Sequence, residues 1–203
     1  MDPQGPVAAA IDELWWLMLG LGIAVFAVFL VLLVIGLVRE PTEQADADPQ
    51  RRIRRWLVGG GVVLPLVVVT VVFGATVRAM QAVPGVAPPG ALVVEIIGHQ
   101  WRYEVGYPEE GVTAVDELHL PVGRPVALHL TSADVIHSFW VPELGGKLDM
   151  LPDGTNVLVL QADRPGQYTA RCAEFCGLGH ASMQLDVVAE SPEAFASWVA
   201  AQQ

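Results

Sequence analysis

The sequence predicts a protein in two parts, a hairpin of two membrane-spanning helices followed by a small all-β domain. Two observations carry this prediction. Residues 14–38 and 56–77 contain no charged side chain, and about 20 apolar residues suffice to cross the hydrocarbon core as a helix. After residue 90, apolar and polar residues alternate in short runs separated by Gly, Pro and Asp, which is typical of β-strands.

The two apolar runs account for the high mean hydropathy of +0.46. Residues 1–13 contain acids but no Lys or Arg, and the run that follows is longer than the core of a cleaved signal peptide. We therefore expect a retained membrane anchor over 14–38 and a second span over 56–80. Pro65 and the three glycines of 59–61 should loosen the second helix or let another helix approach closely.

The basic residues predict the orientation of the hairpin. The connecting loop, residues 39–55, carries all the arginines of this region except Arg78, whereas the N-terminal tail, residues 1–13, has none. The positive-inside rule places such a loop in the cytoplasm and both flanking segments outside. We expect a multi-pass protein of a bacterial inner membrane, in contact with lipid, whose C-terminal domain lies on the outer, periplasmic face.

The outer part divides into a Pro/Gly linker over 81–90, a β-domain over 91–190 and a C-terminal helix over 191–203. At least six short strands in about 100 residues predict a β-sandwich or a Greek-key barrel. In the final helix, Ser191 is the expected N-cap. The strand-like runs are 91–98, 99–107, 125–132, 156–163, 166–172 and 183–190.

The outer domain is acidic, with five basic and fifteen acidic side chains after residue 90, a balance of about −10. An acidic surface attracts a basic protein partner and speeds its association, although it also keeps a domain soluble. Charge alone does not decide between these two roles. We expect no nucleic-acid partner.

Both cysteines of the chain lie in one stretch, RCAEFCGLGHASM, residues 171–183. Outside the cytoplasm, two nearby cysteines usually form a disulfide, and that alternative stays open. However, His180 and Met183 follow closely, and thiolate, imidazole and thioether ligands together favour copper. Two thiolates in one loop can bridge two copper ions, and a second metal ion then requires a second imidazole.

The other histidines differ in how well they suit that role. His119 and His129 fall inside strand patterns and are expected to be ordinary strand residues, while His99 opens a strand. His137 lies in a turn-like stretch between apolar residues, ADVIHSFWVP. By position alone it is a fair candidate for the second imidazole.

The sequence resembles subunit II of the cytochrome c oxidases of the haem–copper superfamily, which carries the dinuclear copper centre CuA. The resemblance covers the hairpin, the linker, GHQWRYE (98–104), DVIHSFWVPELGGKLDMLPD (134–153) and CAEFCGLGHASM (172–183). It implies a cupredoxin fold for the outer domain. The copper ligands it implies are the side chains of His137, Cys172, Cys176, His180 and Met183 and the backbone carbonyl of Glu174.

The resemblance also implies a function. Cytochrome c would donate single electrons to CuA, with Trp101 as the residue that receives them. The electrons would pass to the haem and copper of subunit I, where O2 is reduced to water with proton pumping, and subunit III would be a further partner. The Glu174 carboxylate would reach a magnesium ion at the boundary with subunit I. Candidate acids for docking cytochrome c are Glu109, Glu110, Asp116, Glu117, Asp149 and Asp153.

The sequence departs from the family pattern in two places. Many relatives carry a glutamate near the cytoplasmic start of the second helix, where this chain reads IRRWLVGGG, 53–61. Proton uptake through this subunit would then use Glu40 or Glu43, or lie elsewhere. The family phrase LPG also reads LPDG here, at 151–154.

Four alternatives compete with the oxidase hypothesis. A quinol oxidase subunit II lacks the copper ligands, and a nitrous oxide reductase is a soluble enzyme with a large separate catalytic domain. A copper chaperone needs a labile, exposed Met/His site, and a disulfide-stapled structural or receptor domain needs no metal. The complete ligand set together with the membrane hairpin favours the oxidase subunit.

Overall fold

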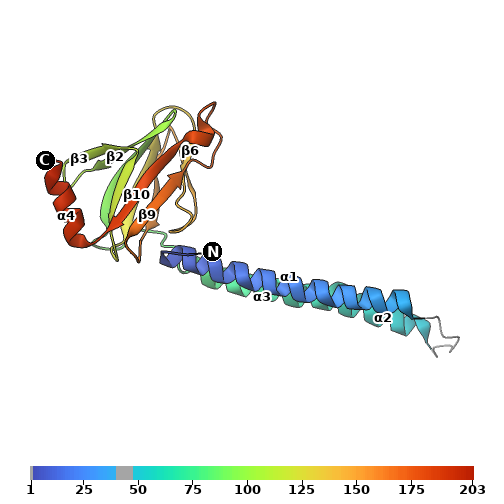
Figure 1. Cartoon of the computed structure of the whole chain (residues 1–203). Helices are drawn as coiled ribbons and strands as arrows, with labels where there is room; N and C mark the ends of the chain where they lie inside the picture. The colour runs from blue at the N-terminus through green and yellow to red at the C-terminus, as the bar shows by residue number, and fades with distance from the viewer. Residues whose placement is uncertain (1, 40–47) are drawn as a thin grey trace. The chain divides into compact units, whose positions relative to one another are not determined.

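The computed structural model describes residues 2–39 and 48–203. Glu40 and Glu43, the suggested proton-uptake acids, lie outside the described residues. The chain forms two compact units (Figure 1). One is the helical segment Glu13–Met80, and the other joins the residues up to Asp12 with Gln81–Gln203.

The helical unit contains two stretches that are long and apolar enough to cross a membrane. The first is α1, Pro6–Val38. The second runs without a break through α2 (Pro49–Val58), the π-helical turn η1 (Gly59–Val63) and α3 (Leu64–Met80). Their large apolar side chains are exposed, as expected for surfaces that face lipid or other membrane helices.

Both helices begin earlier than the charge pattern suggested. The first starts at Pro6 instead of residue 14, and the second starts at Pro49, inside the expected loop. The reason in the second case is a cap, because the Asp48 carboxylate accepts the N–H of Arg51 at 3.0 Å and Pro49 suits the first helical position.

The π-helical turn coincides with the glycine run and precedes Pro65. A proline has no N–H for the carbonyl four residues earlier, and its ring clashes with that carbonyl. In η1 the N–H of Leu64 bonds instead to the carbonyl of Gly59, which widens the helix by one residue just before the proline. The expected local loosening of the second span therefore takes the form of a π-bulge.

The first residues are bound to the β-domain. The N–H of Gln4 donates to the carbonyl of Glu143 at 2.8 Å, and its own carbonyl accepts from Asp163 at 2.7 Å. At Gly5 an added Cβ would lie 2.3 Å from the carbonyl oxygen of Gln161, so only glycine permits this close approach.

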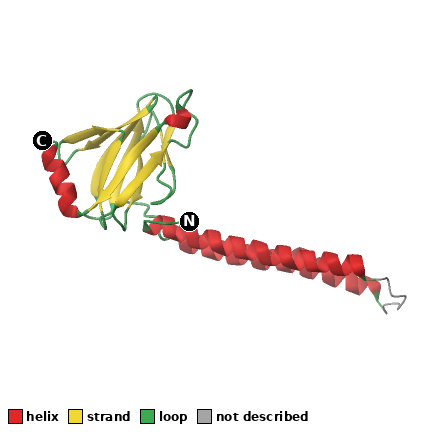
Figure 2. Cartoon of the chain, viewed as in Figure 1, coloured by secondary structure: helices red, strands yellow, loops and turns green. Residues whose placement is uncertain are grey.

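The β-domain contains ten strands among the described residues, arranged in three sheets (Figure 2). The largest has the order β3-β2-β1-β5-β8, the second β4-β10-β9, and β6 pairs with β7. The strands are β1 (Leu92–His99), β2 (Arg102–Tyr107), β3 (Val112–Val115), β4 (Glu117–Pro121), β5 (Val126–Ser132), β6 (His137–Phe139), β7 (Leu148–Met150), β8 (Asn156–Leu160), β9 (Gly166–Arg171) and β10 (Gln184–Glu190).

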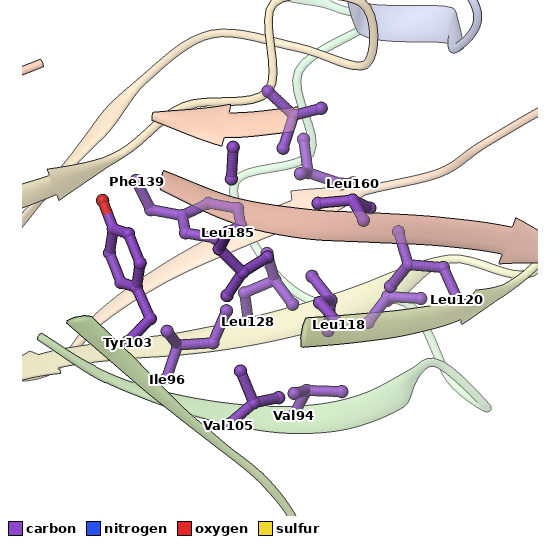
Figure 3. Packing of buried hydrophobic residues seen from close by; sticks show 14 of the residues in the cluster. Val94, Ile96, Tyr103, Val105, Leu118, Leu120, Leu128, Phe139, Leu160 and Leu185 are labelled. Carbon is purple, nitrogen blue, oxygen red and sulfur yellow. The ribbon is translucent and has the colours of Figure 1, made fainter. Parts of the chain in front are cut away.

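The core lies between the two larger sheets. In β1 the alternate residues Leu92, Val94 and Ile96 are buried, and β10 contributes Leu185 and Val187 in the same way. Side chains from both sheets meet in one cluster (Figure 3). This two-layer packing confirms the predicted all-β sandwich and gives its end loops a rigid base.

The C-terminal helix α4 (Pro192–Ala201) packs against β2 and β4, because Phe195 contacts Tyr107 and Trp198 contacts His119. Ser191 caps it, as the sequence indicates, by accepting the N–H of Ala194 at 3.2 Å. Trp198 stacks on the ring of His119 with centroids 4.0 Å apart. His119 is thus a buried strand residue. Its Nε2 lies 2.8 Å from the Glu117 carboxylate, and its Nδ1 lies 2.7 Å from the Glu190 carboxylate.

Candidate metal centre

The two cysteines lie on the loop that joins β9 to β10, and His137 begins β6. Strand β6 is tied to this loop, because Trp140, just beyond it, forms an isolated bridge with Arg171 at the end of β9. The loop turns at Gly177, whose φ of 119° favours glycine. Residues 35 apart in sequence therefore meet at one end of the sandwich.

The candidate ligand atoms form a tight cluster around Cys176. Its Sγ lies 3.7 Å from Sγ of Cys172, 3.7 Å from Nδ1 of His180 and 3.9 Å from Sδ of Met183. One ligand atom each from His137, Cys172 and Cys176 lies within 4.8 Å of the other two. The structure thus brings together every side chain that the resemblance implied as a copper ligand.

The backbone of Glu174 also faces this cluster. Its carbonyl oxygen accepts a hydrogen bond from the Cys172 thiol at 3.2 Å. A carbonyl at this place offers a weak oxygen ligand beside the two sulfurs.

Both cysteines are free thiols and both are buried. Their 3.7 Å separation is far longer than the bond of about 2.05 Å in a disulfide. Burial, followed by the hydrogen bond and the charge of Cys172, raises the pKa of Cys176 to about 11. A buried thiol that gives up its proton needs a compensating positive charge, and a metal ion supplies one.

A buried nitrogen without a partner gives a direct test of whether the site fits a metal. Nδ1 of the fully buried His137 has no hydrogen-bond partner, whereas Nε2 of the same ring bonds to the Asp134 carboxylate at 2.7 Å. Metal-bound histidines commonly hold their second nitrogen against a carboxylate in this way. The site therefore fits a soft metal ion such as copper.

A hydrogen-bonded frame fixes the ligand loop against β6. Ser138 accepts the N–H of Ala173 through its hydroxyl at 2.7 Å, and its carbonyl accepts from the buried Tyr103 hydroxyl at 2.8 Å. The N–H of Cys172 bonds to the carbonyl of Met183 at 3.2 Å. The frame leaves the ligand side chains little freedom to move.

Trp101 lies directly on the ligand loop. Its indole N–H donates to the carbonyl of Cys176 at 3.2 Å, and the amide of Gln100 donates to the same carbonyl at 2.7 Å. An added Cβ on Gly179 would lie only 2.5 Å from the indole ring, so the ring rests on bare backbone. The side chain is nevertheless 40% exposed, which gives it contact with both solvent and loop.

The Glu174 carboxylate is paired with a lysine. It accepts a hydrogen bond from Nζ of Lys147, which also bonds Asp149 at 2.8 Å. Hydrogen bonds to these two carboxylates raise the pKa of Lys147. An ammonium group thus lies between these two carboxylates, and no role for magnesium follows from this arrangement.

The acids expected to dock a donor do not form one group. Glu109 and Glu110 follow β2 at the end remote from Trp101, and the six residues of β2 span about 20 Å. Asp116 accepts the N–H of Tyr103 at 2.7 Å, which is a structural contact, and Glu117 binds His119. Asp149 lies opposite Ser138 in the β6–β7 pair, close to the ligand loop, and Asp153 follows it in the chain.

Sequence reasoning missed Asp134 and Gln100. Asp134 binds His137 through one carboxylate oxygen and accepts the N–H of Gln100 through the other at 2.8 Å. It therefore links a candidate ligand to the residue before Trp101. The three-residue step from Asp134 to His137 is a local signal that could have drawn attention to it, whereas the contact with Gln100 arises only in the fold.

Replacing Asp134 by alanine should weaken copper binding without unfolding the domain. The ring of His137 would lose the partner that orients it, and such losses typically cost about 10–100-fold in metal affinity. Competition with a chelator measures the effect. Asp134→Asn, which keeps a hydrogen-bond acceptor, should restore most of the copper affinity. Asp163→Ala removes the same charge at another position and is the control. An Asp134→Ala protein that retains copper as firmly as the control would contradict the role given to this carboxylate.

Comparison with known proteins points to one family. Residues 110–191 match the family described as cytochrome c oxidase subunit II, periplasmic domain. Cytochrome c oxidase subunit 2 of Alkalihalophilus pseudofirmus is 33% identical over 210 residues, which cover 98% of this chain and 60% of that relative. Quinol oxidase subunit 2 of Bacillus cereus is 32% identical over 206 residues, covering 98% of this chain and 71% of the relative.

Solved structures agree with this comparison. The periplasmic domain of cytochrome oxidase subunit II from Bradyrhizobium japonicum is 28% identical, with a TM-score of 0.55, and the match covers 58% of this chain and 96% of that one. A subunit II domain solved in a mixed disulfide with a thioredoxin-like protein is 29% identical, with a TM-score of 0.51, over 58% and 95% of the two chains.

The β-sandwich and its loop of thiol and imidazole side chains define a cupredoxin-like domain, which two membrane-anchoring helices precede in the chain. The chain belongs to the subunit II family of the haem–copper oxidases. This family includes subunits of both cytochrome c oxidases and quinol oxidases.

Proposed function

We propose that this chain is the subunit of a cytochrome c oxidase that accepts single electrons from cytochrome c at a dinuclear copper centre. The observation that carries the proposal is the buried cluster of two free thiols beside the unpartnered Nδ1 of His137. When bound, the copper pair takes up and releases one electron at a time.

The ligand roles follow from the chemistry of each group. The thiolates of Cys172 and Cys176, together with the imidazoles of His137 and His180, would hold the two copper ions. Thioethers and carbonyls are weaker donors, so the side chain of Met183 and the carbonyl of Glu174 would complete the set. This set leaves no open position for a substrate, which suits electron transfer and not substrate chemistry.

The protein around the ligands would keep the centre dry and stiff. Cys176 and Met183 are 3% and 1% exposed, so water has little access to the sulfur atoms. Asp134 holds the ring of His137, and Ser138 holds the loop backbone. A site that hardly moves when its charge changes needs little reorganisation, which favours fast electron transfer.

Trp101 would receive the electron from the donor. Its ring is partly exposed on one side and bonded to the backbone of Cys176 on the other. Phe175 and Leu178, on the same loop, are 81% and 98% exposed, which is typical of a surface that meets another protein. Asp134, whose carboxylate accepts the backbone N–H of Gln100 beside Trp101, and the partly exposed Glu104 on β2 join Asp149 as candidates to attract a basic cytochrome c.

The complete ligand set favours cytochrome c over quinol as the donor. The relatives include quinol oxidase subunits that cover nearly the whole chain, so similarity alone leaves the donor open. A quinol oxidase subunit has no use for a copper pair at this position. The grouping of thiols, imidazoles and thioether here therefore supports cytochrome c as the proposed donor.

The partners and location follow from the same proposal. Electrons would pass to the haem and copper of subunit I, which reduces O2 to water with proton pumping, and subunit III would be a further neighbour. The hairpin would anchor the chain in a bacterial inner membrane, with the arginine-rich connection in the cytoplasm. The cupredoxin-like domain would then lie in the periplasm.

The donor is tested by measuring turnover of the purified oxidase with reduced cytochrome c and, separately, with a quinol. We expect activity with a basic cytochrome c only. Because an acidic surface steers the donor, the association rate should fall about tenfold or more between low and physiological salt. Quinol oxidation that persists when cytochrome c is inactive would contradict the proposed donor, and a flat salt response would exclude steering by the acidic face.

A further inference from the structure

Helix α2 turns the arginine-rich stretch before the second membrane span into a fixed surface. Four arginines lie within five consecutive residues, 51–55, and all four are exposed. At 3.6 residues per turn, these four side chains occupy one half of the helix, whereas Ile53 and Leu57 point to the other half. The helix is therefore basic on one face and apolar on the other.

The length of the helix sets the depth of these arginines. The charge-free run 56–77 is about 33 Å long at 1.5 Å per residue, which matches the roughly 30 Å of the hydrocarbon core. The helix continues beyond this run to Pro49 without a break. The arginines therefore lie at the level of the lipid headgroups, with Trp56 at the boundary, where indole rings concentrate.

A groove of about 700 Å³ opens on the basic face. Space is open beyond Gly59 and Gly60, since a Cβ at either position would meet nothing within 4 Å. The groove thus runs from guanidinium groups past bare backbone toward the hydrocarbon level. Among the described residues that line the groove, the acid Asp48 caps α2 by accepting the N–H of Arg51. The residues that line the groove are Asp48, Arg51, Arg52, Arg55, Trp56, Gly59 and Gly60.

We propose that this groove binds the phosphate headgroup of an anionic phospholipid, with an acyl chain lying along Gly59 and Gly60. Guanidinium groups bind phosphate oxygens in pairs of parallel hydrogen bonds. Anionic lipids are the abundant anions at this depth on the cytoplasmic side. The site rests on the membrane placement of the hairpin and is independent of the copper centre.

The test is native mass spectrometry of the full chain in a neutral detergent, titrated with phosphatidylglycerol or phosphatidylcholine. Phosphatidylglycerol should bind more tightly. Arg55→Gln should weaken its binding about fivefold, the equivalent of roughly 1 kcal/mol for one arginine at a lipid phosphate. Arg39→Gln removes the same charge outside the groove and should leave binding unchanged. Equal affinity for the two lipids, or equal losses in the two variants, would overturn the site.

A second pair of variants tests the shape of the groove at constant charge. Gly59→Leu fills the groove and should weaken phosphatidylglycerol binding by a similar factor, whereas Gly74→Leu, also in open space, should not. Unchanged binding in Gly59→Leu would overturn the proposed course of the acyl chain. Displacement of the lipid by inorganic phosphate would show a simple anion site instead. Copper content should be normal in all four variants, so this test and the test of the electron-transfer role fail separately.

Discussion

The Cys176→Ser protein is expected to bind at most one copper ion per chain and to lose nearly all electron transfer from cytochrome c. Cys176 is at the centre of the cluster, with its sulfur within 3.9 Å of three other candidate ligand atoms. A serine hydroxyl is a hard oxygen donor that keeps its proton, so it cannot bridge two copper ions. We expect turnover to fall at least about 100-fold, or roughly 2.7 kcal/mol in barrier height.

Copper analysis and the electron paramagnetic resonance spectrum measure this effect. Met183→Leu is the matched control on the same loop, because it removes only a weak ligand. It should retain both copper ions with a changed redox potential. A Cys176→Ser protein that keeps two copper ions and an unchanged spectrum would refute the bridging role.

Replacing Trp101 should separate electron arrival from copper binding. Trp101→Leu removes the exposed ring over the ligand loop, so reduction by cytochrome c should slow at least about 100-fold, again roughly 2.7 kcal/mol. The copper ions should remain, because no ligand side chain has changed. Stopped-flow mixing with reduced cytochrome c measures the rate.

A second substitution identifies which property of the ring matters. Trp101→Phe keeps an aromatic ring but loses the N–H that bonds the carbonyl of Cys176, so its rate should fall between those of the other two proteins. A small reductant that reaches the centre directly should reduce all three proteins at similar rates. If cytochrome c reduced Trp101→Leu as fast as the unaltered protein, electrons would arrive by another route.

The part of the fold that could be predicted from the sequence is the part in which apolar and polar residues alternate clearly. The six runs proposed as strands all contain strands of the structure. Alternate residues are buried most clearly in β1 and β10. The strands that were not identified are β3, β6 and β7, which have three or four residues. In β6 all three residues are buried, so no alternation marks it.

The helix boundaries show a signal that was present but not used. Asp48 followed by Pro49 is a typical start, an N-cap and a first-turn proline. Counting charges alone assigned those residues to a loop. The arginines therefore lie on a helix, and this fixed spacing creates the groove proposed for a lipid headgroup.

The candidate site also has a part that the sequence predicted and a part that only the tertiary structure reveals. Four of its side chains come from one short loop, so spacing alone suggested a metal. His137 lies 35 residues before Cys172 and enters the cluster only because β6 is bridged to β9. The pairing of the Glu174 carboxylate with Lys147 also depends on tertiary structure, and no local pattern predicts it.

The most direct test of the account is the copper content of the chain, reconstituted with copper under reducing conditions and then oxidised. The expected result is two copper ions per chain, a purple colour and a resonance spectrum in which one unpaired electron is shared by two equivalent copper ions. A colourless protein with Cys172 and Cys176 joined in a disulfide, or a protein that holds a single copper ion, would contradict it.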